Sequence, residues 1–198
     1  MMQYINATAD LKQYAFIGDD LKDCELALFV DADWASDRSD YKSTAGGYFV
    51  LLGPNTFFPL APLCKKQGAQ SLSTPEAESV AFAIALRELI LPNMDLWELM
   101  LDLKVNTLTV TVFEDNEATQ KLIKSGKFDK AMGHVKRTHG ISLSFSHEVY
   151  KKGLIEVKDC HTKAMCADIF TKSVIEAEAW DHARLLLGIG STPNVTMA

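Results

Sequence analysis

Two carboxylates follow a short hydrophobic run. Residues 26–30 read LALFV, which is apolar on both faces and typical of a central strand covered on both sides. Asp31 and Asp33 come next, and alternation along a strand places both on one face. Negative charge at the end of a buried strand is unfavourable unless a cation meets it. The pattern therefore predicts a bound metal ion, with further acids converging on Asp31.

Glu78 is a candidate second ligand because it lies beside the apolar stripe of a predicted helix. Thr74 has the hydroxyl of an N-cap residue, and Pro75 suits the first helical position. At distances of 3, 4, 7 and 11 residues from Glu78 the chain is apolar, a spacing that does not favour an ordinary surface glutamate. The alternative is that Glu78, in the first turn, stabilises the helix dipole without a metal.

Asp115 and Asp168 complete the set of candidate acids. Asp115 follows the strand-like sequence TVTVF, and an aspartate there is also a common N-cap. If its strand lies parallel and adjacent to the strand before Asp31, the two acids end on the same side of the sheet. Asp168 lies in the segment CADIFTK, where the alternative is an ordinary solvated helix residue.

The four acids occur in the chain order Asp–Glu–Asp–Asp. Oxygen ligands suit Mg²⁺, with Mn²⁺ as a possible substitute. Two such ions about 3.5–4 Å apart can clamp the attacking water and the leaving oxygen of a phosphodiester. The set therefore predicts two-metal phosphodiester hydrolysis, although each acid alone is ambiguous.

The elements that must position these acids alternate between two periods. A meander of three strands precedes β–helix–β units, so the fold class is α/β (mixed α+β): a five-stranded mixed sheet flanked by helices. Two prolines, Pro59 and Pro62, confine the third strand to an edge. The predicted strands are 25–33, 44–52, 56–63, 106–113 and 154–160. The first predicted helix runs from 74 to an end or kink at Pro92. The other predicted helices are 93–103, 114 or 115 to 124, 135–152, 163–173 and 176–187. The final ten residues are predicted to be disordered.

Composition limits the class of protein. The 198 residues, 47% of them hydrophobic, suffice for one full core. The longest apolar run, 80–86, is too short to span a membrane, and no signal peptide is recognisable, so we expect a protein that is not secreted. Four cysteines without CxxC spacing favour a reducing compartment.

Charge is unevenly distributed along the chain. The net charge is −6, yet residues 116–172 hold 11 basic and 6 acidic side chains. A positive surface beside an acidic centre suits a phosphate-handling metal enzyme, and a solvated helical face is the alternative. The candidate phosphate contacts are Lys65, Lys66, Lys121, Lys124, Arg137 and Lys163.

Several short motifs resemble one family together. The segments FVDADWASD, DYKSTAGGYFVLL, CKKQ, SLSTPEAESVAFA, FEDNEAT, HVKRTHGI and ADIFTK resemble, in order and spacing, the ribonuclease H domain of Ty1/copia-type retrotransposon polyproteins. The resemblance covers roughly residues 4–175. It implies the ribonuclease H-like fold and an enzyme that hydrolyses the RNA strand of RNA–DNA hybrids during reverse transcription.

The resemblance also implies roles for individual residues. Asp31 would bridge two Mg²⁺ ions, Glu78 and Asp115 would hold the ion beside the leaving 3′ oxygen, and Asp168 would help hold the ion that activates water. Asp33 would have a supporting role. His161, seven residues before Asp168, would either shuttle protons or aid product release, and the alternative is an ordinary loop residue. The chain departs from the family in lacking a tryptophan ahead of CKKQ and in a glycine shifted into the 132–141 segment.

The resemblance implies a domain organisation and a cellular context as well. Residues 1–20 would be a lead-in from an upstream reverse transcriptase or connection region, 21–175 the ribonuclease H-like domain, and 176–198 a C-terminal helix with a disordered tail. The partners would be the hybrid and the reverse transcriptase and integrase regions of a parent polyprotein, with no membrane. The location would be the cytoplasm, in a virus-like particle, or the nucleus.

Two other functions are compatible with this fold. A nucleic-acid-binding or scaffolding module that has lost catalysis would have lost some of the four acids, and all four are present. An integrase-like strand-transfer enzyme would place its glutamate last in chain order, whereas Glu78 comes second.

Overall fold

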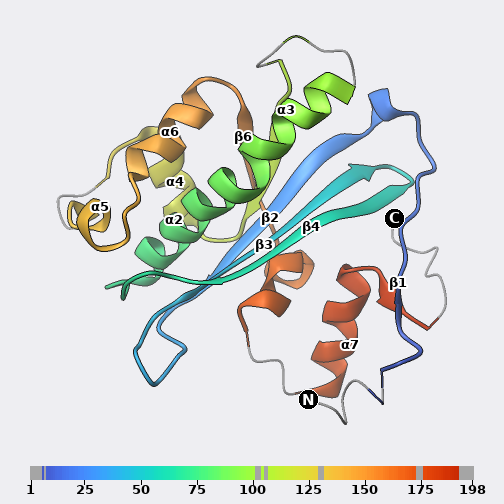
Figure 1. Cartoon of the computed structure of the whole chain (residues 1–198), viewed down its shortest axis with the longest axis horizontal. Coiled ribbons are helices and arrows are strands. Elements are labelled where there is room, and N and C mark those ends of the chain that lie inside the picture. The colour runs from blue at the N-terminus through green and yellow to red at the C-terminus, as the bar shows by residue number, and fades with distance from the viewer. Residues whose placement is uncertain are drawn as a thin grey trace.

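A mixed sheet of five strands forms the centre of the molecule (Figure 1). The computed structural model describes residues 6, 8–100, 104, 107–128, 132–172 and 176–191. The strands run in the order β4-β3-β2-β5-β6. Their bounds are β2 Glu25–Asp33, β3 Thr44–Gly53, β4 Thr56–Lys66, β5 Val110–Glu114 and β6 Ile155–Asp159. The predicted five-stranded mixed sheet with flanking helices is confirmed.

The strand directions follow from the connections. The loop 34–43 and the tight turn 54–55 make β2, β3 and β4 antiparallel neighbours, while helical crossovers make β2, β5 and β6 parallel. Pro59 and Pro62 lie in β4, which is an edge strand as predicted. The β3–β4 register shifts between Phe49 and Val50, opposite this proline-containing stretch.

One face of the sheet carries most of the helices (Figure 1) and the larger hydrophobic core. Side chains of β2 such as Leu28 and Val30 pack there against Phe82 and Ile84 of α2. The helical elements of this layer are α2 Thr74–Ala85, η2 Leu86–Ile90, α3 Leu91–Met100, α4 Glu117–Ser125, α5 Val135–Thr138 and α6 Leu143–Lys151.

Two predictions about α2 need correction. Its N-cap is Ser73, whose hydroxyl accepts the Glu76 N–H at 3.4 Å, and Thr74 is the first helical residue. The helix end predicted as one alternative at Pro92 is wrong, because η2 passes directly into α3, which contains Pro92. The other alternative, a kink at Pro92, stays a prediction. The Asn93 side chain donates a hydrogen bond to the Leu89 carbonyl at 2.6 Å. Residues 101–103, the end of the predicted second helix, lie outside the described residues.

The predicted helix at 135–152 is also wrong in part. It is divided into α5 and α6, and Gly140 between them has φ +67°. This left-handed conformation is costly for other residues and favours glycine, so the chain turns here instead of continuing the helix.

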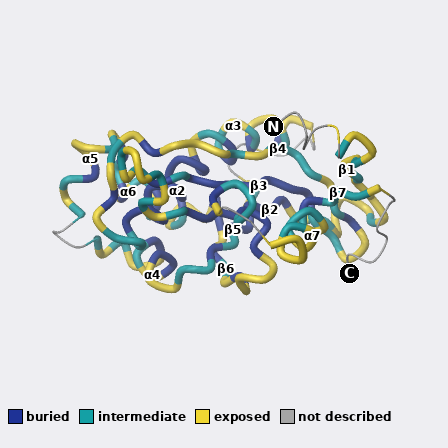
Figure 2. The backbone as a smooth tube through the Cα atoms, turned by 90° about the horizontal axis from the view of Figure 1, so that it is seen from below, coloured by how far each residue is buried: buried dark blue, intermediate teal, exposed yellow. Residues whose placement is uncertain are grey.

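The opposite face is covered by the C-terminal part of the chain (Figures 1 and 2). A second core unites Phe29 and Tyr48 of the sheet with Met165, Cys166 and Leu187. The elements of this layer are β1 Lys12–Gln13, η4 Thr162–Ala164, η5 Cys166–Phe170, α7 Ala177–Leu186 and β7 Ile189–Gly190, and a short turn of 3₁₀ helix, η1 Leu21–Asp23, precedes β2. The predicted helix 163–173 is therefore two short 3₁₀ turns, with residue 173 outside the described part.

The two ends of the described chain meet in a small ribbon. Strands β1 and β7 pair antiparallel, with Lys12 opposite Gly190. The prediction of disorder from residue 189 is thus wrong for Ile189 and Gly190, and residues 192–198 lie outside the described range.

Candidate metal centre

Three of the predicted acids converge at the carboxyl ends of the parallel strands. Asp31 lies near the end of β2 and Asp115 directly follows β5; because Val30 pairs with Glu114, the two aspartates are neighbours. Glu78 reaches the same place from the first half of α2. One carboxylate oxygen from each of the three lies within 4.8 Å of the others. The expected meeting of Asp31, Glu78 and Asp115 is thus observed.

The three acids have the chemistry of a divalent-cation site. Asp31 and Glu78 are 2% and 4% exposed, so water cannot solvate their charge well. Glu78 Oε2 is buried and has no hydrogen-bond partner among the described residues. An orphaned, hard oxygen donor on a residue of this carboxylate cluster fits Mg²⁺ or Mn²⁺.

Asp168 lies beside this group and is linked to it through a lysine. The ammonium of Lys172 lies 2.7 Å from Asp168 Oδ1 and 3.3 Å from Asp31 Oδ1. Asp168 is not among the acids within 4.8 Å of one another. The structure therefore brings together three of the four predicted acids and places the fourth across an ammonium group.

The approach of this last segment depends on a glycine in β3. Gly46 is the partner of Asp31 in the β2–β3 register. A Cβ at Gly46 would lie 2.5 Å from Thr171 Cγ2 and 3.0 Å from the Ala167 carbonyl oxygen. The missing side chain lets η5 lie close on the sheet, where the Thr171 hydroxyl donates a hydrogen bond to Asp31 Oδ2.

Sequence reasoning missed a further buried acid, Glu114. It is fully buried, its Oε1 accepts the Asn116 N–H at 3.1 Å, and its Oε2 has no partner among the described residues. Strand alternation could have revealed it, because Glu114 shares a face with the core residues Val110 and Val112. The cap of the next helix α4 is Asn116, so Asp115 is not an N-cap.

Burial and mutual repulsion raise the pKa values of these acids. The pKa of Glu78 rises to about 10, chiefly through burial and then through Glu114 and Asp31. Burial also raises the pKa of Glu114 well above its ordinary value. The pKa of Asp168 is raised by burial, against the opposing effect of Lys172. A cation in the cluster would remove this penalty.

The raised pKa of Glu78 predicts an unusual pH dependence for the metal-free protein. Because the folded state binds a proton that the unfolded state releases above about pH 4.5, the free energy of unfolding should fall as the pH rises towards 10. We expect Glu78→Gln to weaken this dependence between about pH 5 and about pH 9. Urea denaturation in EDTA measures it, and equal slopes in both proteins would contradict the prediction.

Two residues near Asp115 come from the loop after β6. The Thr162 hydroxyl donates a hydrogen bond to Asp115 Oδ2 at 3.2 Å. The neighbouring His161 is exposed, and its Nδ1 accepts the Lys163 N–H at 3.1 Å. His161 thus caps η4 beside the cluster. Asp33, the other acid of the first motif, pairs with Thr44 in the sheet and is not part of the group of three.

The predicted phosphate contacts occupy different surroundings. Lys65 pairs with Glu88 at 2.6 Å, and Lys66 pairs with Asp37 at 2.5 Å and Asp40 at 2.9 Å. Hydrogen bonding to Asp37 raises the pKa of Lys66. The other four are exposed: Lys121, Lys124, Arg137 and Lys163.

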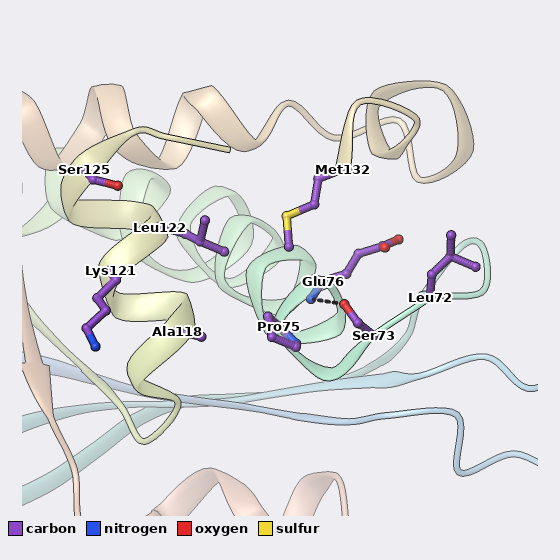
Figure 3. A pocket seen from close by; sticks show the side chains of 9 residues that line it. All are labelled: Leu72, Ser73, Pro75, Glu76, Ala118, Lys121, Leu122, Ser125 and Met132. Carbon is purple, nitrogen blue, oxygen red and sulfur yellow. Dashed lines mark hydrogen bonds between the residues drawn. The ribbon is translucent and has the colours of Figure 1, made fainter. Parts of the chain in front are cut away.

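A cavity of about 570 Å³ lies between α4 and the N-terminal end of α2 (Figure 3). Lys121 and Glu76 line opposite walls, and the Lys121 ammonium pairs with Glu117 at 2.7 Å. The buried Glu76 carboxylate is 3.1 Å from His134 Nε2. The cavity thus adjoins the helix that supplies Glu78.

Two curated proteins resemble this chain over most of its length. It is 29% identical over 168 residues to the retrovirus-related Pol polyprotein from transposon RE1 of Arabidopsis thaliana, covering 85% of this chain. It is 29% identical over 172 residues to the corresponding polyprotein from transposon RE2 of the same plant, covering 87%. This chain resembles a segment of retrotransposon Pol polyproteins. It spans 11% of the length of each relative, and no family model matches it.

Solved ribonucleases H resemble the fold at low sequence identity. They include a ribonuclease H1 isolated from compost by a metagenomic approach (16% identity, TM-score 0.49, 80% of this chain and 97% of that one). The N-terminal ribonuclease H domain of a Mycobacterium tuberculosis protein is 13% identical with a TM-score of 0.47, and the match covers 81% of this chain and 96% of that one. Ribonuclease H1 of Halobacterium salinarum is 15% identical with a TM-score of 0.44, and the match covers 79% of this chain and 98% of that one.

Membrane insertion has no support in the helices of the described residues. None of them is both long and apolar enough to cross a bilayer.

Proposed function

We propose that this chain is a ribonuclease H that cleaves the RNA strand of RNA–DNA hybrids with two divalent ions. The observation that carries the proposal is the convergence of Asp31, Glu78 and Asp115, with a buried Glu78 oxygen left unpaired. The resemblance to retrotransposon Pol polyproteins supports the choice of substrate, because reverse transcription generates such hybrids.

The acids divide into two sets in this proposal. Asp31, Glu78 and Asp115 would hold one ion, and Asp31 with Asp168 would hold the second. When bound, the ions would stabilise charge on the phosphodiester and lower the pKa of a water. The chain itself orients Asp115 through the Thr162 hydroxyl and Asp31 through the Thr171 hydroxyl.

The hybrid would contact the basic surface near the cluster. Lys124, Arg137 and Lys163 are exposed and available to phosphates, while Lys65, Lys66 and Lys121 would exchange their carboxylate partners for phosphates. The RNA strand would be distinguished by its 2′-hydroxyl groups.

We also propose the domain organisation and context given by the resemblance. Residues 1–20 would be the lead-in from a reverse transcriptase or connection region, 21–175 the catalytic domain, and 176–198 the C-terminal segment. The β1–β7 ribbon would then join the lead-in to the C-terminal segment. The reverse transcriptase and integrase regions would be partners in the cytoplasm or nucleus.

A strand-specific cleavage assay tests the proposed function. The RNA strand of an end-labelled hybrid should be cut in Mg²⁺ or Mn²⁺ and left intact in EDTA. Single-stranded RNA, duplex RNA and duplex DNA serve as controls and should remain whole. Absence of cutting under every ion condition, with the fold intact, would favour a binding or scaffolding module instead.

His161 is a separate proposal as a proton shuttle. The Nδ1 atom of His161 accepts the backbone N–H of Lys163, and no hydrogen bond joins the ring to Asp31, Glu78 or Asp115 among the described residues. We therefore expect His161→Ala to lower turnover by less than about tenfold. An essential general acid–base group contributes about 10²–10⁴-fold. Single-turnover kinetics across pH measures this effect. An unchanged rate and pH profile would remove the shuttle role and leave the residue as a cap.

A further inference from the structure

A lysine ammonium occupies the space between two of the acids assigned above to the second metal ion. Lys172 Nζ lies 2.7 Å from Asp168 Oδ1 and 3.3 Å from Asp31 Oδ1, so it makes the contacts that a shared cation would make. Among the described residues, Asp31 is the member of the three-acid group that this ammonium contacts, and no ion pair reaches Glu78 or Asp115. The pair of Asp31 and Asp168 thus already holds a positive charge, whereas Glu78 and Asp115 do not contact one in the described part of the chain.

The local backbone holds Lys172 in this position. The Lys172 N–H donates to the Asp168 carbonyl at 2.8 Å, which places the two side chains one turn apart on the same side. The preceding residue, Thr171, bonds Asp31, and the close approach of η5 to Gly46 fixes the segment on the sheet. The ammonium therefore lies between the acids because of the fold and not through a chance surface contact.

Lys172 also has a route out of the centre. Its side chain is 42% exposed, whereas that of Asp31 is 2% exposed and that of Asp168 is 23% exposed. A long, flexible side chain with a solvated end can move away when another cation takes its place beside Asp31. Departure without a replacement would leave the buried Asp31 charge unpaired, which is costly. The acids, in contrast, are fixed on the sheet and on η5.

We propose that Lys172 is a resident cation that competes with the second divalent ion for Asp31 and Asp168. The first ion would bind the preformed group of Asp31, Glu78 and Asp115. The second would bind only as Lys172 leaves, so its affinity is lower than the four acids alone would give. This inference rests on the proposed function, because it concerns the same centre.

Metal titration without substrate tests the competition. We expect calorimetry and Mn²⁺ electron paramagnetic resonance to show one ion bound to the wild type at least tenfold more tightly than a second. Lys172→Gln should tighten the second ion by at least tenfold and leave the first within threefold. Lys172→Arg keeps the charge and should keep the weak second site. Adding Asp168→Asn to Lys172→Gln should abolish the second site.

The matched control is Lys151→Gln, which also removes one positive charge. Lys151 is the last residue of α6 and lies near the first residue of β6, whereas the acidic cluster lies at the opposite, carboxyl end of the parallel strands. It should bind both ions as the wild type does. If Lys172→Gln does not fold in EDTA, acylation of the wild type by an N-hydroxysuccinimide ester gives the answer. Mn²⁺ should then increase labelling of Lys172 several-fold relative to Lys151.

The outcomes separate the two proposals. Two ions bound with equal strength by wild type and Lys172→Gln, or Lys172 labelling that Mn²⁺ does not change, would overturn the competition and leave the proposed function standing. A second ion weakened in Lys172→Gln would also overturn it, because Lys172 would then support Asp168. Absence of any divalent ion on the wild type would remove the proposed function and the competition together.

Discussion

Asp115→Asn is expected to reduce cleavage of the RNA strand by about a hundred- to a thousand-fold, the range for removal of one preorganised electrostatic group. Asparagine has nearly the same shape, but it supplies a neutral oxygen where a divalent ion requires negative charge. Asp115 is only partly buried and accepts a hydrogen bond from the Thr162 hydroxyl, so the fold should persist. Steady-state cleavage in saturating Mg²⁺, with circular dichroism as the fold check, measures the effect.

The matched control is Asp95→Asn. Asp95 is exposed on α3 and lies more than ten residues after Glu78 in the sequence. Its replacement by asparagine removes the same charge. It should cleave as the wild type does. In EDTA, Asp115→Asn should unfold at no lower a urea concentration than the wild type, because one repulsive charge is gone. Retained cleavage by Asp115→Asn would contradict the assignment of the centre.

Gly46→Ala is expected to affect both stability and cleavage, although position 46 carries no chemistry. The added methyl would lie 2.5 Å from Thr171 Cγ2 and 3.0 Å from a backbone oxygen of Ala167, so η5 must shift. Overpacking of this kind costs about 1–3 kcal/mol. The shift would carry Asp168 and Lys172 away from Asp31, so cleavage should fall as well.

Gly68→Ala provides the comparison. A Cβ at Gly68 meets no heavy atom within 4 Å, and its φ is outside the left-handed region. This variant should stay within about 0.5 kcal/mol of the wild type, as ordinary surface changes do. Urea denaturation and the cleavage assay applied to both variants give the answer. Equal stability of the two would mean that the sheet does not depend on the close approach at Gly46.

Local sequence patterns predicted the sheet better than the ends of helices. The strand at 25–33 has its predicted bounds, because an apolar run followed by acids has few alternative placements in a core. The helix predicted at 135–152 was too long because periodicity does not register a left-handed turn at Gly140. The start of α2 was misplaced by one residue because Ser73 and Thr74 both carry hydroxyls that can cap a helix.

The candidate centre was predictable in its members but not in its pairing. The proximity of Asp31 and Asp115 was predicted because each lies at the end of a predicted strand, and adjacent parallel strands end at the same edge of the sheet. The ammonium between Asp31 and Asp168 was not foreseen, because it depends on how η5 lies on β3, a contact between distant segments. Glu114 was not predicted because a glutamate is rarely fully buried, even where strand alternation places it on the same face as Val110 and Val112.

The hydrogen bond from Thr171 to Asp31 joins residues 140 positions apart in the chain. During synthesis, residues of β2 and α2 leave the ribosome long before the segment that carries Thr171 and Lys172. The early carboxylates therefore repel one another without their late partners, and contacts of such separation form slowly. A chain released before residue 168 would contain all five strands of the sheet yet lack Asp168 and Lys172, together with Leu187 of the second core. Premature termination would therefore leave both the proposed second cation site and the covering of one face of the sheet incomplete.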